Sequence, residues 1–293
     1  MQTQKPLTLV DPKNGNLAFK IFSYSDNCPF DHVQRNNYYS IIINLTGSGK
    51  LKSDFSSYEF SAPAMMGFSP YQPYMISDSE HMRGIILNFH PDFFCIHLHQ
   101  KEVACNGVLF NNIYQPPFIK LADKDVTGFL NIIEQMQAEM QNPALAQYEL
   151  LVSYLKILLI NGSRLRLEQN QHLQSEVPGL REPFVLQNLK DAIEENFKTR
   201  HAPSDYADML NISPKALAKI TRNHFNKTLT NMIAERIVIE AKRELYLTSK
   251  PVKSIAYELG FNDEFYFSRF FKNNADVSPQ LYRDTVGFAR AEA

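Results

Sequence analysis

The chain has 293 residues, 44% of them hydrophobic and 21% charged, with a formal net charge of −1. This composition excludes a disordered or polycationic chain, and the length suggests two domains of about 100–200 residues each. Three cysteines do not make a disulfide framework, and no apolar run suits a signal peptide or a membrane span, so we expect a cytoplasmic protein without membrane contact.

The N-terminal part of the chain is expected to form short strands separated by turns. The strand candidates are Tyr38–Leu45, Ser57–Ser61, Met65–Phe68 and Met82–Phe89. The first is expected to end at the Thr46–Gly49 turn cluster, and prolines follow the other three. Short strands punctuated by glycine and proline favour a β-sandwich or a barrel over residues 1–122.

Two helices are expected next, over Asp125–Gln141 and Ala144–Glu168, separated by Asn142-Pro143. Apolar residues recur at spacings of three and four in the first of them, which predicts an amphipathic helix. They are Val126, Phe129, Leu130, Ile133, Met136 and Met140. We expect residues 123–168 to form a helical hairpin whose excess apolar positions serve dimerisation. The polar, glutamine-rich residues 169–180 then form a linker to a second domain over 181–293.

The second domain repeats a short pattern. Residues 207–213 resemble residues 256–262, and the correspondence continues at an offset of 50, with Leu217 matching Phe267. In the second copy a helix is expected to stop at Gly260, which adopts the left-handed conformation at little cost, and Asn262 or Asp263 caps the next helix. Two helices joined by a tight turn are typical of helix-turn-helix units, although most such hairpins only pack against their neighbours.

At this point the sequence resembles the C-terminal DNA-binding domain of the AraC/XylS transcriptional regulators. The residues that carry the resemblance are Ile255-Ala256, Gly260-Phe261, Tyr266-Phe267-Ser268-Arg269, Phe271-Lys272, Ser278-Pro279 and Tyr282-Arg283. The resemblance implies an α+β multidomain protein: a cupin-like sensor domain with a helical hairpin, then an all-α domain with two helix-turn-helix units. Asn226 and Asp276 stand where the family usually has glycine, and Thr221 stands where an aromatic residue is typical. Asn and Asp tolerate the left-handed conformation best among the other residues, so both turns can survive.

The candidate DNA-binding residues are Lys215, Lys219, Arg222, Lys227, Glu264, Ser268, Arg269 and Lys272. Lys215 and Lys219 share a helix face and suit guanine edges, whereas Arg222 and Lys227 suit phosphates. In the second unit Glu264 suits a cytosine amino group, and Arg269 suits guanine or phosphate. Lys272 is a weaker candidate for phosphate, as is Lys253. For each of these residues the competing interpretation is a solvated surface charge.

The first domain offers two kinds of candidate site. Tyr38, Phe68, Tyr71 and Tyr74 are candidates to line a small-molecule pocket, although aromatic residues at strand spacing usually belong to a core. Cys95, His97 and His99 would share one face if they lay on a strand, which is how a metal site could form. A loop or helix end with incidental histidines is the favoured interpretation, so we expect neither a metal nor a cofactor.

We therefore expect a sequence-specific transcriptional regulator, not an enzyme, that responds to a ligand through its first domain. Double-stranded DNA is the expected partner, with RNA polymerase, an unidentified small-molecule effector and a second copy of the chain as further candidates. Two alternatives stay open. One is a metal-dependent cupin-type enzyme with an accessory DNA-binding domain, and the other is a dimeric regulator that needs no ligand.

Overall fold

The structure, a computed structural model, describes residues 5–11, 15–25, 29–175 and 184–286, without the side chains of 171–175. The chain divides into two compact units. The first unit contains residues 1–112 and 116–167, and the second contains residues 113–115 and 168–293. No helix among the described residues combines the length and the apolar character needed to cross a lipid bilayer.

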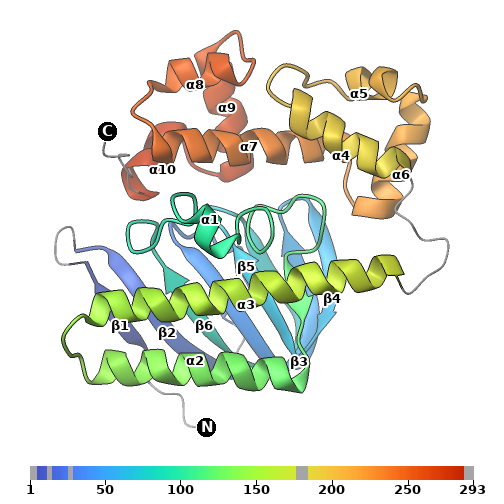
Figure 1. The fold of residues 1–293 in the computed structure, drawn as a ribbon. Helices are drawn as coiled ribbons and strands as arrows, with labels where there is room; N and C mark the ends of the chain where they lie inside the picture. The colour runs from blue at the N-terminus through green and yellow to red at the C-terminus, as the bar shows by residue number, and fades with distance from the viewer. Residues whose placement is uncertain (1–4, 12–14, 26–28, 176–183, 287–293) are drawn as a thin grey trace. The chain divides into compact units, whose positions relative to one another are not determined.

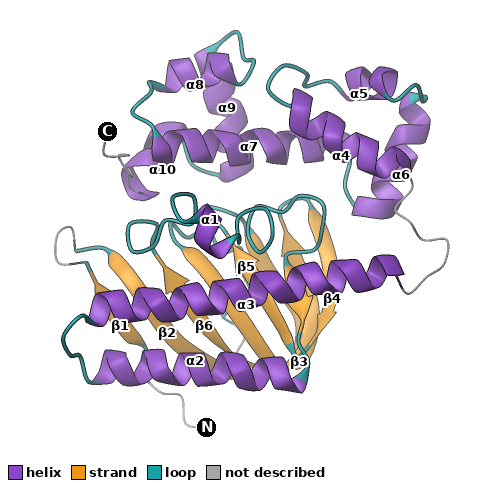
Figure 2. Ribbon diagram, in the orientation of Figure 1, coloured by secondary structure: helices purple, strands orange, loops and turns teal. Residues whose placement is uncertain are grey.

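The first unit is built on an antiparallel sheet of seven strands (Figures 1 and 2). The strand order is β1-β2-β6-β3-β5-β7, and β4 pairs with β3 off this path. The strands are β1 (Leu7–Val10), β2 (Leu17–Ser25), β3 (Tyr39–Ser53), β4 (Ser56–Ser61), β5 (Ala64–Phe68), β6 (Tyr74–Phe89) and β7 (Phe118–Lys120). An antiparallel sheet followed by a helical region confirms the predicted mixture of strand and helix.

The apolar runs in β3 and β6 arise because both faces of these central strands are buried. Side chains alternate between the two faces of a strand. Ile41 and Ile43 therefore belong to one core cluster, and Ile42 between them belongs to the other. A strand covered on both faces shows a continuous apolar run instead of alternation, which is why YYSIIINL was recognisable as a strand.

β3 continues through the Thr46–Gly49 turn cluster, so the predicted end of this strand was wrong. The pairing of β3 with β6 shifts register between Asn44 and Thr46 and again on both sides of Ser48. Gly47 has a φ of 90°, and a Cβ atom there would lie 2.3 Å from the Glu80 carbonyl oxygen. The glycines therefore permit irregular pairing within a long strand instead of ending it.

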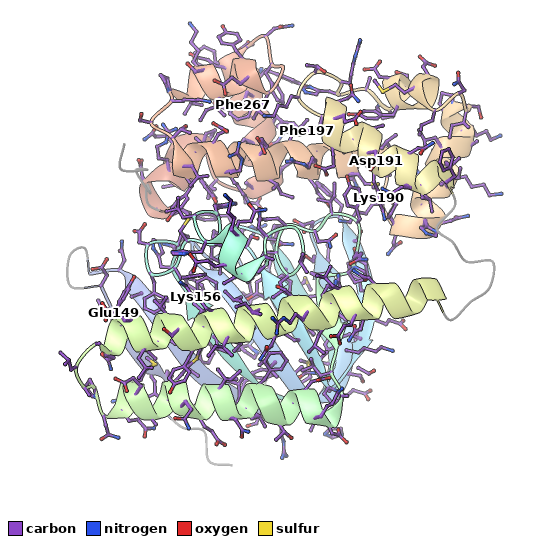
Figure 3. All side chains as sticks on the ribbon, viewed as in Figure 1. Glu149, Lys156, Lys190, Asp191, Phe197 and Phe267 are labelled. Atoms are coloured by element: carbon purple, nitrogen blue, oxygen red, sulfur yellow. The ribbon has the colours of Figure 1, made fainter. Side chains whose placement is uncertain are left out.

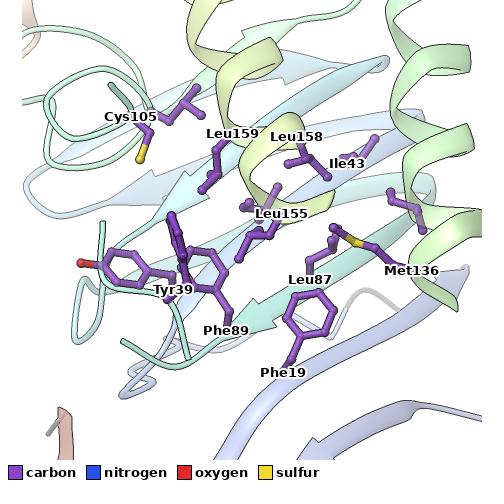
Figure 4. Close-up of a cluster of buried hydrophobic side chains, with 14 of the residues drawn as sticks. Phe19, Tyr39, Ile43, Leu87, Phe89, Cys105, Met136, Leu155, Leu158 and Leu159 are labelled. Atoms are coloured by element: carbon purple, nitrogen blue, oxygen red, sulfur yellow. The ribbon is translucent and has the colours of Figure 1, made fainter. Parts of the chain in front are cut away.

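Helices α2 (Asp123–Gln141) and α3 (Gln147–Ser175) lie across one face of the sheet (Figure 1). Phe129, Ile133 and Met136 of α2 are buried in the core cluster that also holds residues of β3 and β6. Figure 4 shows Met136 beside Leu87, with Leu155 and Leu158 contributed by α3. Phe129, Ile133 and Met136 of the predicted apolar stripe therefore pack inside the unit.

The predicted linker is partly helical. α3 continues to Ser175, past the expected end of the hairpin at residue 168. Residues 176–180 of the predicted linker lie outside the described residues.

The short helix α1 (Gln100–Val103) lies between β6 and β7 in the order of the chain.

The described part of the second unit is made of helices and loops (Figure 2). The helices are α4 (Phe184–Asn196), α5 (Pro203–Met209), α6 (Pro214–Phe225), α7 (Leu229–Leu247), α8 (Val252–Glu258), α9 (Glu264–Ala275) and α10 (Pro279–Val286). α7 connects the two helix pairs, and its Ile233, Ile237, Ala241 and Leu245 are buried. It packs against α4, α6, α8, α9 and α10, so it forms the centre of the unit.

Candidate DNA-binding surface

The first helix pair, α5 and α6, is joined by a tight turn. Asn211 in this turn has a φ of 52°, in the left-handed region that Asn tolerates. Ser213 caps α6 by accepting a hydrogen bond from the Ala216 amide at 3.2 Å, and Pro214 follows as the first helical residue. The start of α6 is therefore fixed by local chemistry.

α6 separates its residues cleanly by face. Leu217, Thr221 and Phe225, each four residues apart, are buried. The Thr221 hydroxyl donates to the Ala218 carbonyl oxygen at 3.1 Å, which satisfies this polar group in the position where an aromatic residue was expected. Ile220 is only half-buried, so Leu217, Thr221 and Phe225 form the inner face of the helix.

Three predicted residues, Lys215, Lys219 and Arg222, are exposed on the outer face of α6. In the described part of the chain none of them has a carboxylate partner. Lys215 and Lys219 lie four residues apart, where like charges repel, and Lys215 lies in the first turn, where the helix dipole disfavours a cation. The charges of Lys215 and Lys219 therefore cost stability locally, and the helix fold gives no reason for them, whereas Arg222 lies in the last turn, where the helix dipole favours a cation.

The second helix pair, α8 and α9, repeats this arrangement. Gly260 between the helices has a φ of 80°, and a Cβ atom there would lie 2.2 Å from the Lys198 carbonyl oxygen, so only glycine fits. Asp263 caps α9 by accepting hydrogen bonds from the amides of Phe265 at 2.6 Å and Tyr266 at 3.2 Å. The cap is therefore Asp263, one of the two residues predicted for it.

An aromatic cluster holds α9 in place. Phe267, which is labelled in Figure 3, and Phe271 are fully buried and lie four residues apart on α9. The Phe261 ring lies 5.2 Å from the Phe267 ring, and Phe271 lies 5.8 Å from Tyr282 of α10, both edge-on. Ile255, Ala256 and Leu259 are also buried, so the inner face of α9 meets α8 through apolar contacts.

The outer face of α9 carries the other predicted residues. Arg269 and Lys272 are exposed, and Glu264 and Ser268 are half-buried. Both helices end in the left-handed conformation, at Asn226 with a φ of 55° and at Asp276 with a φ of 61°. The tolerance of these two residues for this conformation, predicted from their chemistry, is confirmed.

Sequence reasoning missed two exposed aromatic residues at the start of α9. Phe265 is 71% exposed and Tyr266 is 58% exposed, beside the half-buried Glu264. Phe265 precedes Arg269 by four residues, so both lie on the same face of the helix. The spacing of Phe265 and Arg269 is visible in the sequence. The many phenylalanines in this segment, however, indicated a role in packing and not an exposed position.

Lys227 does not belong with the exposed cations. Its side chain is 5% exposed, and its ammonium group lies 2.6 Å from the Glu235 carboxylate of α7. A lysine held in a buried ion pair is not presented to a phosphate, so the structure does not support the predicted phosphate contact. The sequence showed the charge of Lys227 but gave no sign that Glu235 would meet it.

α7 carries a network of paired charges. Glu240 lies 2.9 Å from Arg243, 3.1 Å from Lys198 and 3.4 Å from Arg236. Burial raises the pKa of Glu240, but hydrogen bonds from Arg243 and Lys198 and the charges of Arg243 and Arg236 lower it to about 2. Glu244 adds contacts to Arg243 and Lys250.

The residues predicted to line a pocket in the first unit have different positions. The rings of Phe68 and Tyr74 stack at 3.8 Å and are buried in a core cluster on the sheet. Tyr71 has a φ of 53° in a turn and is half-buried. Tyr38 is also half-buried, and burial raises the pKa of its phenol. Phe68 and Tyr74 fill this space with each other, so their packing is that of a core.

The favoured interpretation of Cys95, His97 and His99, a loop or helix end, is confirmed. These residues lie in a turn that leads into α1, where the strand-face argument does not apply. The His99 Nδ1 atom lies 2.9 Å from Glu102, and its ring stacks on Phe94 at 4.8 Å. Among the described residues, no three His, Cys, Asp or Glu side chains are arranged to hold a metal ion.

Comparisons with known proteins concern mainly the second unit. Residues 206–285, which include the end of α5 and all of α6, α8 and α9, match the family model described as "Helix-turn-helix domain". The raffinose operon transcriptional regulatory protein RafR of Pediococcus pentosaceus is 30% identical over 95 residues, which cover 32% of this chain and 34% of RafR. The transcriptional activator RhaS of Mannheimia succiniciproducens is 29% identical over 91 residues, 31% of this chain and 34% of RhaS.

The chain therefore spans about a third of the length of these curated relatives. Among solved structures, the apo form of a ToxT variant from Vibrio cholerae aligns over 93% of this chain and 99% of that chain. The sequence identity is 17% and the TM-score is 0.41.

Proposed function

From the AraC-type helix-turn-helix domain at residues 206–285, we propose that the chain is a sequence-specific, DNA-binding transcriptional regulator. The relatives matched by this region are transcriptional regulators, not enzymes. The observation that carries the proposal is the outer face of α6, where Lys215, Lys219 and Arg222 are exposed and unpaired within the described chain. A cationic helix face that costs local stability is suited to a polyanion.

The two helix pairs act in this proposal as two helix-turn-helix units, with α6 and α9 as the recognition helices. Each recognition helix has a capped start, a buried face and an exposed face, which is what insertion into a major groove requires. Two such helices in one chain would occupy successive major grooves about 34 Å apart along the DNA. The site on DNA is then bipartite, with one element for each helix.

The exposed residues have distinct roles in the proposal. Lys215 and Lys219 read guanine edges, and Arg222 contacts phosphate. On α9, Arg269 reads guanine or contacts phosphate, and Glu264 accepts from a cytosine amino group. Ser268 reads a base or contacts phosphate. Lys272 and Lys253 contact phosphate. Lys227 is left out because of its buried pair with Glu235.

The first unit is proposed to be a cupin-like sensor domain that responds to a small molecule. The sheet-and-hairpin unit supports this division because it has its own core and is compact apart from the helical unit. In this scheme residues 1–122 sense the ligand, the helical hairpin that begins at residue 123 extends to Ser175, and residues 181–293 bind DNA. A homodimer, contact with RNA polymerase and action in the cytoplasm are parts of the same proposal.

Selection of bound duplexes from a random pool by the purified chain tests the function. We expect enriched sequences with two short elements separated by about one helical turn, roughly 10 base pairs. A Lys215→Ala, Lys219→Ala double variant should lose the element read by α6 and keep the other. Enrichment of no sequence at all would contradict the proposal, and a single undivided element would contradict the use of both helices.

A further inference from the structure

An open cavity of about 390 Å³ lies at the edge of the sheet in the first unit. Its walls come from β1, the start of β2, the turn after β6 and the first residues of α3. β1 is the edge strand of the sheet (Figure 1). The volume falls in the range of about 300–1,000 Å³ that is usual for small-molecule sites.

One wall of the cavity is apolar and rigid. Leu9 and Leu17 contribute aliphatic surface, and Phe93 contributes an aromatic ring. The Phe93 ring stacks on Phe19 at 5.2 Å and meets the Tyr148 ring edge-on at 4.8 Å. The Tyr148 hydroxyl donates to the Phe93 carbonyl oxygen at 2.6 Å, which fixes the turn against α3. The wall is therefore preformed for an apolar molecule.

The polar part of the cavity is acidic. Asp11 and Asp92 line it, and no lysine or arginine does so among the residues that the structure describes. The Asp92 backbone amide donates to Nδ1 of the buried His90 at 3.3 Å, which fixes the backbone that carries the Asp92 carboxylate. Burial raises the pKa of the Tyr148 phenol, and the charges of Asp11, Glu149 and Asp92 raise it further. The acidic groups thus create a negative potential within the site.

We propose that this cavity binds a small organic cation: an amine on an apolar body, with the apolar part against Leu17 and Phe93 and the ammonium group near Asp92 and Asp11. The inference rests on the proposed function, because it assigns a place and a chemical class to the ligand of the sensor. It differs from the predicted pocket at Tyr38, Phe68, Tyr71 and Tyr74, where Phe68 and Tyr74 fill the space with each other.

The position of the cavity suggests how ligand binding would change the structure elsewhere in the chain. Gln147 and Tyr148, which line it, are the first residues of α3, and α3 continues without a break to Ser175. A bound molecule would touch the edge strands and the start of this helix together. Occupancy of the cavity would therefore favour one placement of α3 on the sheet over others.

Three probes of similar size and different charge test the proposal: 2-phenylethylamine, 2-phenylethanol and 3-phenylpropionate. Isothermal titration with the full chain should show tightest binding of the amine, at least about tenfold over the alcohol, with the carboxylate weakest. Asp92→Asn should remove the preference for the amine over the alcohol. Asp31→Asn is the matched control, since Asp31 is an exposed aspartate that does not line the cavity. Equal binding of amine and carboxylate, or no amine binding, would overturn the proposal.

A second variant separates the site from a general loss of structure. Val10 lines the cavity and is 50% exposed, so Val10→Trp should fill the space and block all three probes without removing a polar group. Unchanged amine binding by this variant would place the ligand elsewhere and overturn the proposal. Gel shifts on the selected DNA, with and without the amine, complete the test. Amine binding without any DNA binding supports the cavity and contradicts the proposed function. DNA binding without amine binding contradicts the cavity alone.

Discussion

The second unit holds two kinds of basic residue, and their surroundings differ sharply. On the outer faces of α6 and α9, Lys219 and Arg269 are exposed, and neither has a carboxylate partner within the described residues. On α7, Arg236 and Arg243 meet Glu240, whose side chain is 8% exposed, at 3.4 Å and 2.9 Å. The same residue types are thus neutralised on the central helix and left available on the two proposed recognition helices.

This difference shows which charges serve the fold and which serve a ligand. A carboxylate that is buried among several cations serves the fold, because removing one of its partners leaves an uncompensated buried charge. Exposed cations without partners add little stability, and in the first turn of a helix they reduce it. Lys215, in the first turn of α6, is the clearest case, so we assign its charge to binding.

The largest expected effect concerns the buried pair of Lys227 and Glu235. Glu235→Gln should lower the free energy of unfolding by about 3–5 kcal/mol, because it leaves the Lys227 ammonium group buried without its carboxylate. Urea denaturation of the purified variants gives the measurement. Glu258→Gln is the matched control, since Glu258 pairs with Lys250 at 2.6 Å but is 47% exposed and should cost less than about 1 kcal/mol.

Replacing both members of that pair sharpens the test. Lys227→Met combined with Glu235→Leu should recover most of the lost stability, because neither member of the pair then leaves an uncompensated buried charge. The double variant should also keep its DNA affinity if Lys227 has no contact with phosphate. A loss of DNA affinity in a stable double variant would show that Lys227 contacts phosphate after all.

Acid should weaken the network on α7 in a defined pH range. The pKa of Glu240 is lowered in the folded chain to about 2 from its ordinary value of 4.5. A group whose pKa is lowered on folding contributes its full stability above the unfolded pKa, and this contribution disappears as pH falls through the folded pKa. The stability difference between the natural chain and Glu240→Gln should therefore be constant near neutral pH and shrink between about pH 4.5 and 2. A constant difference down to the lower end of this range would contradict the ion-pair assignment.

Local chemistry made much of the second unit predictable. Gly260 requires a positive φ, Phe267 and Phe271 follow helical spacing, and Asn226 and Asp276 tolerate the left-handed conformation. Each of these inferences depends on one residue and its near neighbours in sequence. The exposure of Lys215, Lys219, Arg222, Arg269 and Lys272 followed from the same periodicity.

Contacts between distant residues were beyond this reasoning. β3 continues past its glycines because β6, more than 20 residues further along the chain, is long enough to pair with it. Even the pair of Lys227, in the loop before α7, and Glu235, eight residues later, depends on how that loop folds against the helix. The cavity edged by Asp92 combines residues from three separated parts of the chain. A single sequence contains no signal for such pairings, so the acidic cavity could not be predicted.

Lys219→Ala and Arg269→Ala should each weaken specific DNA binding by about 1–3 kcal/mol while the melting temperature stays nearly constant. Both side chains are exposed, so their removal leaves no cavity and no unpaired buried group. Gel shifts and thermal melts on each variant provide the two readouts. Arg243→Ala is the reciprocal control, because it should lower stability and leave affinity nearly unchanged. Unchanged affinity in both Lys219→Ala and Arg269→Ala would refute the assignment of the recognition helices.

The smallest effect should be seen in the salt dependence of binding. Each cation that neutralises a phosphate adds about 0.9 to the slope of log affinity against log salt concentration. Arg222→Ala should reduce the slope by about that amount, since Arg222 is exposed and unpaired among the described residues. Arg236→Ala should leave the slope unchanged, because Arg236 already pairs with Glu194 at 2.8 Å. Equal slopes for the two variants would mean that the paired cations of α7 contribute to DNA binding as much as those of α6. The contrast between paired cations on α7 and unpaired cations on α6 and α9 would then be wrong.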